Sequence, residues 1–193
     1  MTCFRVAKRY SDEVAAVETE RLRLSVLRRS AHNKVTDYVV RNREWHTEFA
    51  QTHDDSYYTD AAQKEYLDYD VREFRNRRLV PLWITLKDDP TIIIGRVSYF
   101  NIAHGGMMLA QIGYHLDKAY TGQGYMTEAI TETCRMMFDD LKMHRIEAFI
   151  LPENEKSLNL IKRCGFTYEG TRHSYMSING VYRDHETFYL LNS

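Results

Sequence analysis

The spacing of hydrophobic residues changes partway along this chain, and that change limits the folds it can adopt. Apolar residues first follow strand patterns in three consecutive segments, separated by turns at residues 87–90 and 104–106. These segments are residues 82–86, 91–102 and 107–116. From Met126 to Leu141, apolar residues recur at i, i+3, i+4 and i+7, which predicts an amphipathic helix. The pattern therefore predicts an antiparallel meander that leads directly into a helix.

The flanking segments predict further strands and helices of the same sheet. Residues 21–27 alternate like a half-buried strand, and residues 32–79 are typical of two or three polar helices with a mobile connection near residues 53–56. After the amphipathic helix come a strand, a helix capped by Asn154, and two strands around the Asn179-Gly180 turn. These elements are expected at residues 145–151, 154–165, 175–178 and 185–191. The chain is therefore predicted to form an α/β fold with a mixed sheet.

Composition fits one intracellular domain. The chain has 193 residues, and its net charge of −1 argues against nucleic acid as a direct partner. No apolar run exceeds four residues, so no membrane-spanning helix is expected, and Ser11-Asp12-Glu13 stands where a signal peptide would be apolar. Three distant cysteines favour neither a disulfide framework nor a zinc site, which fits a reducing cytoplasm. We expect one domain at residues 18–193 after an N-terminal arm at residues 1–17.

Residues 116–126 pass from a strand to a helix through Gly122 and Gly124. The first N–H groups of a helix lack intrahelical partners and carry partial positive charge, so such a turn can hold a phosphate. A Walker loop is excluded because Tyr125 follows the second glycine, and a Rossmann fingerprint because Thr127 stands where glycine is needed. On the glycines alone, a tight turn without a ligand is the simpler interpretation.

Several short segments share their order and spacing with a known family. They are Thr19–Leu24, Ile112–Leu116, Gly122–Ala129, Asn154–Ser157, Gly165–Gly170, Asn179-Gly180 and Tyr182–His185. Together they cover roughly residues 18–191 and resemble the GNAT N-acetyltransferases, in particular the ribosomal-protein-alanine (RimJ/RimL) type. The resemblance implies a GNAT-like single domain whose central, mostly antiparallel sheet is flanked by helices. Two parallel strands of that sheet would splay apart, with acetyl-CoA in the gap.

The resemblance also assigns residues to acetyl-CoA. Backbone groups of His115 and Leu116 would pair with the pantetheine arm and the acetyl carbonyl, where an N–H facing the oxyanion is worth ~3 kcal/mol in comparable sites. Asn154 would hydrogen-bond the cofactor, a role compatible with capping a helix. The pyrophosphate would lie on N–H groups of Thr121, Gly122, Gln123, Gly124, Tyr125 and Met126. The superfamily usually has Arg or Gln in place of Thr121, and often Gly or Ala in place of Met126.

Ser157 stands where this branch has a serine proposed to protonate the departing thiolate. A serine that bonds a helix carbonyl is an equal alternative, and a thiol pKa of ~8.5 means the thiolate needs little help from an acid. No general base can be assigned, because Met176 replaces a Glu that some relatives carry before the Asn-Gly turn. Glu48, His115 and Asp184 are conceivable bases, but Glu48 also suits a solvated helix face and Asp184 an anchor for the last strand.

Other polar residues indicate no further chemistry. Four arginines form the only basic cluster, namely Arg72, Arg75, Arg77 and Arg78. They could meet ribosomal RNA, an acidic partner or the CoA 3′-phosphate, but a solvated helix face paired with nearby carboxylates explains them better. The eight histidines lack metal-ligand spacing, so no metal is expected. Cys134 and Cys164 suit core packing rather than nucleophilic catalysis.

Three functions are compatible with these features. The first is acetyl-CoA-dependent transfer to the N-terminal α-amine of a protein, for example a ribosomal protein that begins with Ala or Ser. The second is acetylation of a small amine such as a polyamine, amino sugar or drug, and the third is a CoA-binding module without catalysis. Intact Asn154 and Ser157 argue against the third. The sequence leaves the acceptor open, and it fits a monomer as well as a homodimer.

The missing base favours the first function. At pH 7.5 only about one lysine side chain in a thousand is neutral, whereas roughly a third of α-amines are. An enzyme that acetylates lysine therefore needs a positioned base or strong desolvation of the amine. An enzyme that acetylates an N-terminus needs much less help.

Overall fold

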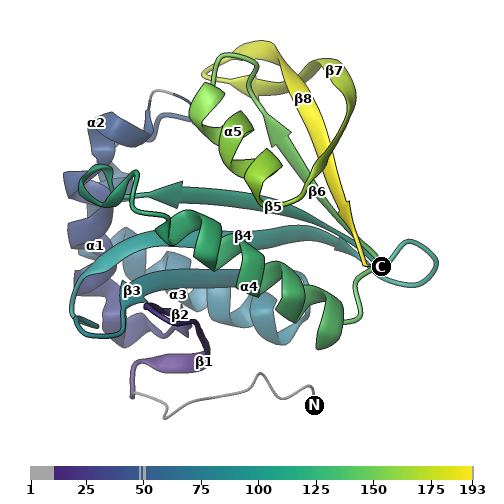
Figure 1. Ribbon diagram of the computed structural model, residues 1–193. Helices are drawn as coiled ribbons and strands as arrows, with labels where there is room; N and C mark the ends of the chain where they lie inside the picture. The colour runs from purple at the N-terminus through teal and green to yellow at the C-terminus, as the bar shows by residue number, and fades with distance from the viewer. Residues whose placement is uncertain (1–10, 48, 50, 193) are drawn as a thin grey trace.

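The computed structural model describes residues 11–47, 49 and 51–192, in which one continuous sheet carries helices on both faces (Figure 1). The described strands follow the order β1-β2-β3-β4-β5-β6-β8-β7, and neighbours are antiparallel except for β5 and β6. Their bounds are β1 Glu13–Glu18, β2 Leu22–Leu27, β3 Val80–Leu86, β4 Ile93–Ala103, β5 Leu109–Leu116, β6 Arg145–Ile150, β7 Thr167–Ile178 and β8 Val181–Leu191. The predicted mixed, mostly antiparallel sheet in a single α/β domain is confirmed.

Helices pack on opposite faces of this sheet. Figure 1 shows α4 crossing one face and α3 lying behind the other. Tyr38 of α1 and Leu67 of α3 share a hydrophobic cluster with Trp83 of β3, whereas the buried face of α4 packs on the main core. The helices are α1 His32–Arg41, α2 Arg43–His46, α3 Asp60–Arg75, α4 Tyr125–Asp139 and α5 Glu155–Arg163, with 3-10 turns η1 Arg29–Ala31, η2 Asp55–Tyr58 and η3 Lys118–Tyr120. Among the described residues, no helix combines the length and apolarity needed to cross a bilayer.

The parallel strands β5 and β6 separate soon after they meet. They pair only where residues 109–111 face residues 145–147. Beyond that point β6 continues along β8 to Ile150, while β5 stays paired with β4 as far as Leu116. The second half of β5 therefore has no strand on its β6 side.

The N-terminal arm expected at residues 1–17 does not extend to its predicted end. Residues 13–18 form the edge strand β1, which pairs with β2, whereas residues 1–10 lie outside the described part. A bulge between Glu13 and Ala15 shifts the register and breaks the alternation that reveals other strands. Glu13 is buried and accepts hydrogen bonds from Arg23 and Ser25 of β2. The arm prediction was therefore wrong for residues 13–17.

Candidate active site

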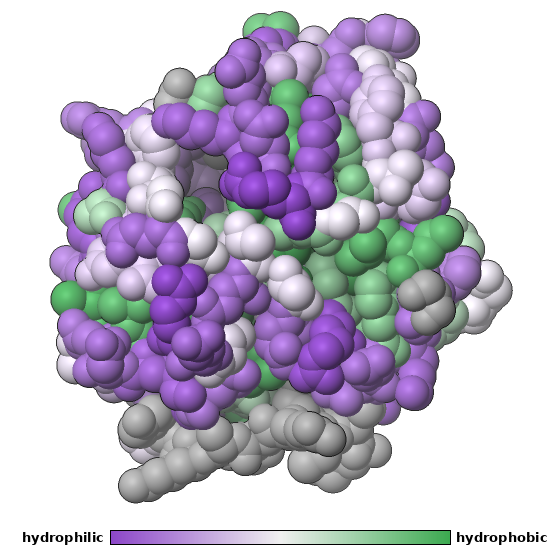
Figure 2. All heavy atoms as spheres, in the orientation of Figure 1, coloured by the Kyte–Doolittle hydropathy of each residue, from purple (hydrophilic) through white to green (hydrophobic). Residues whose placement is uncertain are grey.

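A cavity of about 880 Å³ opens beside the unpaired half of β5, within the size range of ligand clefts. One wall comes from α2 and the segment that follows it to Tyr58. The other walls are the end of β5, residues 121–127 at the start of α4, and α5 with its cap, residues 154–163. Figure 2, drawn in the orientation of Figure 1, shows the surface hollowed between α2 and α5. The cavity therefore joins the predicted cofactor segments to the polar helical segment predicted at residues 32–79.

The glycine turn presents an uncapped helix start to this cavity. Gly122 and Gly124 have φ values of 77° and 82°, a left-handed conformation that side chains with a Cβ rarely adopt. Gly124 is the N-cap of α4, and no side chain caps the N–H groups of the first turn. Such a helix start favours an anion. Five of the six residues assigned to the pyrophosphate line the cavity: Thr121, Gly122, Gly124, Tyr125 and Met126.

Arg21, just before β2, braces this turn from outside. Its guanidinium donates to the Gln123 carbonyl at 3.0 Å and to Glu128 of α4 at 2.7 Å, and it lies 4.5 Å from the Tyr125 ring centroid. Thr19 also donates to Glu128. Although burial opposes its charge, hydrogen bonds from Thr19 and Arg21 lower the pKa of Glu128. The segment Thr19–Leu24 thus serves the glycine turn structurally.

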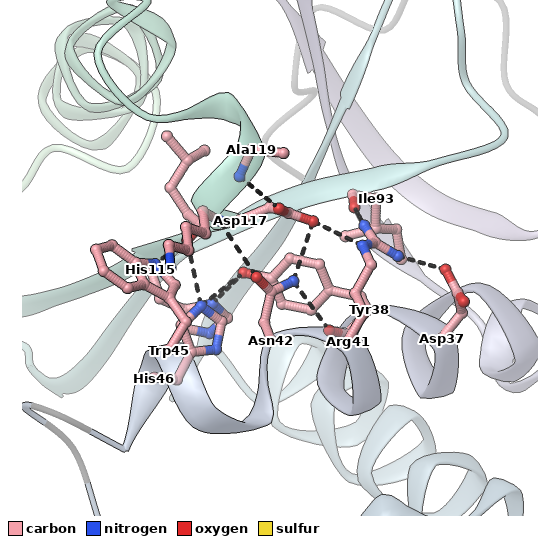
Figure 3. Close-up of polar contacts among 12 residues, drawn as sticks. Asp37, Tyr38, Arg41, Asn42, Trp45, His46, Ile93, His115, Asp117 and Ala119 are labelled. Carbon is pink, nitrogen blue, oxygen red and sulfur yellow. Dashed lines mark hydrogen bonds and ion pairs between the residues drawn. The ribbon is translucent and has the colours of Figure 1, made fainter.

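Asp117 fixes the start of the same loop to α1 (Figure 3). One carboxylate oxygen accepts the Ala119 N–H at 2.9 Å, and the other accepts Arg41 Nε at 2.6 Å and Asn42 Nδ2 at 3.0 Å. Asn42 in turn accepts the Lys118 N–H through Oδ1. Burial opposes the charged form, but these hydrogen bonds outweigh it and lower the pKa of Asp117. The loop is thereby held at both ends.

The Leu116 carbonyl connects β5 to α2. Asp117 donates its N–H to Ile94 of β4 at 2.8 Å, and backbone groups of successive strand residues point to opposite edges. The N–H and carbonyl of Leu116 therefore point away from β4. The carbonyl accepts Trp45 Nε1 at 3.1 Å and lies 3.2 Å from His46 Nε2. This alternation favours Leu116 over His115 as a backbone partner for a cofactor arm.

The side chain of His115 lies in a cluster of rings with Tyr38 and His46 (Figure 3). Its Nδ1 is 2.7 Å from the Tyr38 hydroxyl, and its ring centroid is 4.8 Å from that of His46. Burial lowers the pKa of His115 well below its usual value and is also the main cause of a lowered pKa at His46. Burial raises the pKa of Tyr38 well above its usual value. All three rings are therefore uncharged at neutral pH.

Asn154 and Ser157 meet at the start of α5. Asn154 Oδ1 accepts the Ser157 N–H at 3.1 Å, so the predicted helix cap is confirmed. Ser157 Oγ donates to the Tyr114 hydroxyl at 3.0 Å, and all three residues line the cavity. Burial raises the pKa of Tyr114 to about 12. The arrangement gives Ser157 a polar partner from β5 as well as a place in the cleft.

Other predicted residues lie away from the cavity wall or outside the described chain. Gln123 turns its side chain to the Ala119 carbonyl, and Asp184 binds His173 and the Ser174 N–H on β7. Glu48 is outside the described residues. Burial raises the pKa of Cys134 to about 12 and also raises that of Cys164, so neither thiol is an activated nucleophile.

The basic cluster is partly paired with acidic side chains. In the basic cluster, Arg72 and Arg78 both bind Glu73, while Asp68 pairs with Arg29. Within residues 11–47, 49 and 51–192, no group of three or more His, Cys, Asp or Glu side chains is arranged to hold a metal. The residues that sequence reasoning missed are Trp45 and His46, which lie in a polar segment without a local motif.

Comparison with known proteins places this site in a family. Residues 21–167 match the family model of the acetyltransferase (GNAT) domain. The chain belongs to the GNAT acetyltransferases. It is 38% identical over 152 residues to "Probable N-acetyltransferase YjcK" of Bacillus subtilis, covering 78% of this chain and 83% of that protein.

Two further relatives of this GNAT acetyltransferase carry a substrate in their names. The [ribosomal protein uS5]-alanine N-acetyltransferase of Escherichia coli is 29% identical over 152 residues, covering 79% of this chain and 78% of that protein. The crystal structure of ribosomal-protein-S5-alanine acetyltransferase from Vibrio fischeri superposes with a TM-score of 0.86 at 29% identity, covering 93% of this chain and 97% of that one. The predicted GNAT-like fold and N-acetyltransferase class are confirmed.

Proposed function

We propose that this enzyme transfers acetyl from acetyl-CoA to the N-terminal α-amine of a protein, with a ribosomal protein as the leading acceptor. The observation that carries the proposal is the charge of the cleft. No Asp or Glu is among the described residues that line it, whereas the basic side chains of Arg43, Lys156 and Arg163 do line it. The wall on the α2 side is instead aromatic, with Trp45 and Tyr57 among its residues.

This lining favours an acceptor with one weakly basic amine. A polyamine carries several positive charges, which carboxylates would have to balance in a partly desolvated cleft. An α-amine has a pKa of ~7.7–8.0, so it can enter neutral without such a partner. The two relatives named for the alanine of a ribosomal protein support the same choice.

Acetyl-CoA is proposed to lie across the glycine turn and along β5. The N–H groups from Thr121 to Met126 would hold the pyrophosphate, because α4 starts there without a side-chain cap. The pantetheine arm would follow the open edge of β5, with the N–H of Leu116 as a backbone partner and His115 beside it. Asn154 would face the arm from α5.

Ser157 is proposed to deliver a proton to the departing CoA thiolate. Its hydroxyl lies in the cavity 3.0 Å from the Tyr114 hydroxyl, so when Ser157 turns its proton toward the thiolate, Tyr114 can donate its own proton to Ser157 Oγ. The neutral amine would attack the thioester directly, since the thiols of Cys134 and Cys164 are kept protonated by burial. No covalent enzyme intermediate is then needed.

The first test concerns the glycine turn. Gly124→Val places a Cβ at a φ of 82° and 3.4 Å from Arg21 Nη2, so it strains the turn and disturbs the contact that holds it, and we expect the Kd for CoA to rise at least about tenfold, ~1.4 kcal/mol. Gly180→Val is the control, because Gly180 has a φ of 83° but lies on the β7–β8 turn. Calorimetry that finds equal CoA affinity in folded Gly124→Val and wild-type protein would contradict the site.

A second test separates proton delivery from packing at Ser157. Ser157→Ala should lower kcat about tenfold and leave KM for acetyl-CoA nearly unchanged, because a proton donor acts on the transition state. Tyr114→Phe removes the partner hydroxyl and should have the smaller effect. If Ser157→Ala changes only KM or the melting temperature, the hydroxyl has a structural role alone.

A third test addresses the acceptor. Two forms of one peptide are compared, one with a free N-terminal Ala and one with a blocked α-amine and a free internal lysine. The kcat/KM of the first should be at least about 100-fold higher, because a far larger fraction of α-amines than of lysine side chains is neutral. Spermidine, assayed beside them, should react slowly for lack of carboxylates in the cleft. Faster transfer to lysine or to spermidine would replace the α-amine proposal with the small-amine or lysine alternative.

A further inference from the structure

The hydrogen bonds around the Leu116 carbonyl determine which nitrogen of His46 carries a proton. The carbonyl oxygen can only accept, and the indole of Trp45 can only donate to it. His46 Nε2 lies 3.2 Å from the same oxygen, so the contact is attractive only if Nε2 carries a hydrogen. A neutral imidazole has one N–H. The lone pair of His46 is therefore on Nδ1.

The Tyr38 hydroxyl determines which nitrogen of His115 carries a proton. Tyr38 Oη lies 2.7 Å from His115 Nδ1 and 3.4 Å from His46 Nε2. Because His46 Nε2 already carries a hydrogen, the Tyr38 hydroxyl donates its proton to His115 Nδ1. His115 then holds its hydrogen on Nε2 and has no second lone pair to offer. His115, one of the conceivable bases in the sequence, thus accepts from Tyr38 at Nδ1 and has only the N–H at Nε2 left, so it cannot take up a proton as a neutral base in this arrangement.

His46 is placed to use its free lone pair. It lines the cavity, and its Nδ1 has no hydrogen-bond partner among the described residues, nor is that atom sealed from solvent. Nε2 is bonded to the carbonyl of the strand along which the cofactor arm is proposed to lie. Among the described residues, Asp117 is the carboxylate that acts on the pKa of His46, raising it, and its oxygens are engaged by Arg41 and Asn42.

From this geometry we propose that His46 is the general base of the transfer, with Nδ1 as the proton acceptor and the Leu116 carbonyl as the group that fixes its tautomer. The proposal rests on the acetyltransferase function proposed above. The amine lone pair forms the N–C bond to the thioester carbonyl, and the C–S bond breaks as CoA leaves as a thiolate. His46 Nδ1 takes the proton that the amine nitrogen loses and returns it to solvent, and the thiolate gains a proton from Ser157, which water reprotonates.

A base of this kind suits an α-amine. Burial keeps His46 neutral, and an imidazole is well matched to a nitrogen that becomes acidic once it is bonded to the carbonyl carbon. It is a poor base for a free lysine ammonium, whose pKa is ~10.4. The residue thus supplies the base that the sequence lacks at Met176 without changing the expected acceptor.

Kinetics of two substitutions test the role. His46→Ala and His46→Gln should both lower kcat by about 100-fold or more, since neither side chain can accept a proton. Gln can still donate an N–H to Leu116, so a purely positioning role predicts near wild-type kcat for His46→Gln. Added imidazole should restore kcat of His46→Ala in a saturable way. His104→Ala, on the exposed β4–β5 turn, is the control. It should keep the wild-type kcat, and added imidazole should not change that kcat.

The tautomer can be measured without any activity. In protein with ¹⁵N-labelled histidine at pH 7.5, the His46 signals, identified by their loss in His46→Gln, should show a protonated Nε2 and an unprotonated Nδ1. A protonated Nδ1, full kcat in His46→Gln, or no imidazole rescue of folded His46→Ala would each overturn the proposal. The tautomer and the comparison of variants do not depend on which amine is the acceptor. If the wild type acetylates only a small amine, the α-amine proposal fails, but the role of His46 is still tested by comparing the kcat values of the variants on that amine.

Discussion

Strands β5 and β6 hydrogen-bond over only three residue pairs, and buried backbone groups beyond that point have to find partners elsewhere. The Leu116 carbonyl finds two, the N–H groups of Trp45 and His46. The gap in the sheet therefore opens the cavity and also leaves the Leu116 carbonyl free to bind α2. Helix α2 forms one wall of the cleft and β5 forms another, so hydrogen bonds to this one carbonyl hold the two walls together.

The glycine turn is held by similar long-range contacts on both sides. Asp117 ties its start to α1, and Arg21 ties its middle to β2 and to the first turn of α4. Charged hydrogen bonds of this kind are stronger than neutral ones and keep the loop in place before any ligand arrives. The N–H groups at the start of α4 can then serve an anion without reorganisation, which is how a helix start becomes a binding site.

Local patterns predicted the elements whose burial is one-sided, such as β5 and α4, and the cap at Asn154. They failed at β1, because a bulge at Glu13 and Ala15 breaks its alternation. They also could not find His46, a single histidine in a polar segment whose role depends on Leu116, 70 residues away. In the sequence Arg21 is only a polar position in a strand pattern, yet its guanidinium donates a hydrogen bond to the Gln123 carbonyl in the glycine turn. Tertiary contacts, not local sequence, decide these functions.

The most direct test of this account is a crystal structure of the chain with CoA bound. We predict the pyrophosphate on the N–H groups of residues 121–126 and the pantetheine arm in the gap between β5 and β6, with the thiol near Ser157. The Leu116 carbonyl should still accept from Trp45 and His46, leaving His46 Nδ1 facing the cleft. CoA bound elsewhere, or an arm that displaces both side chains from the Leu116 carbonyl, would contradict the account.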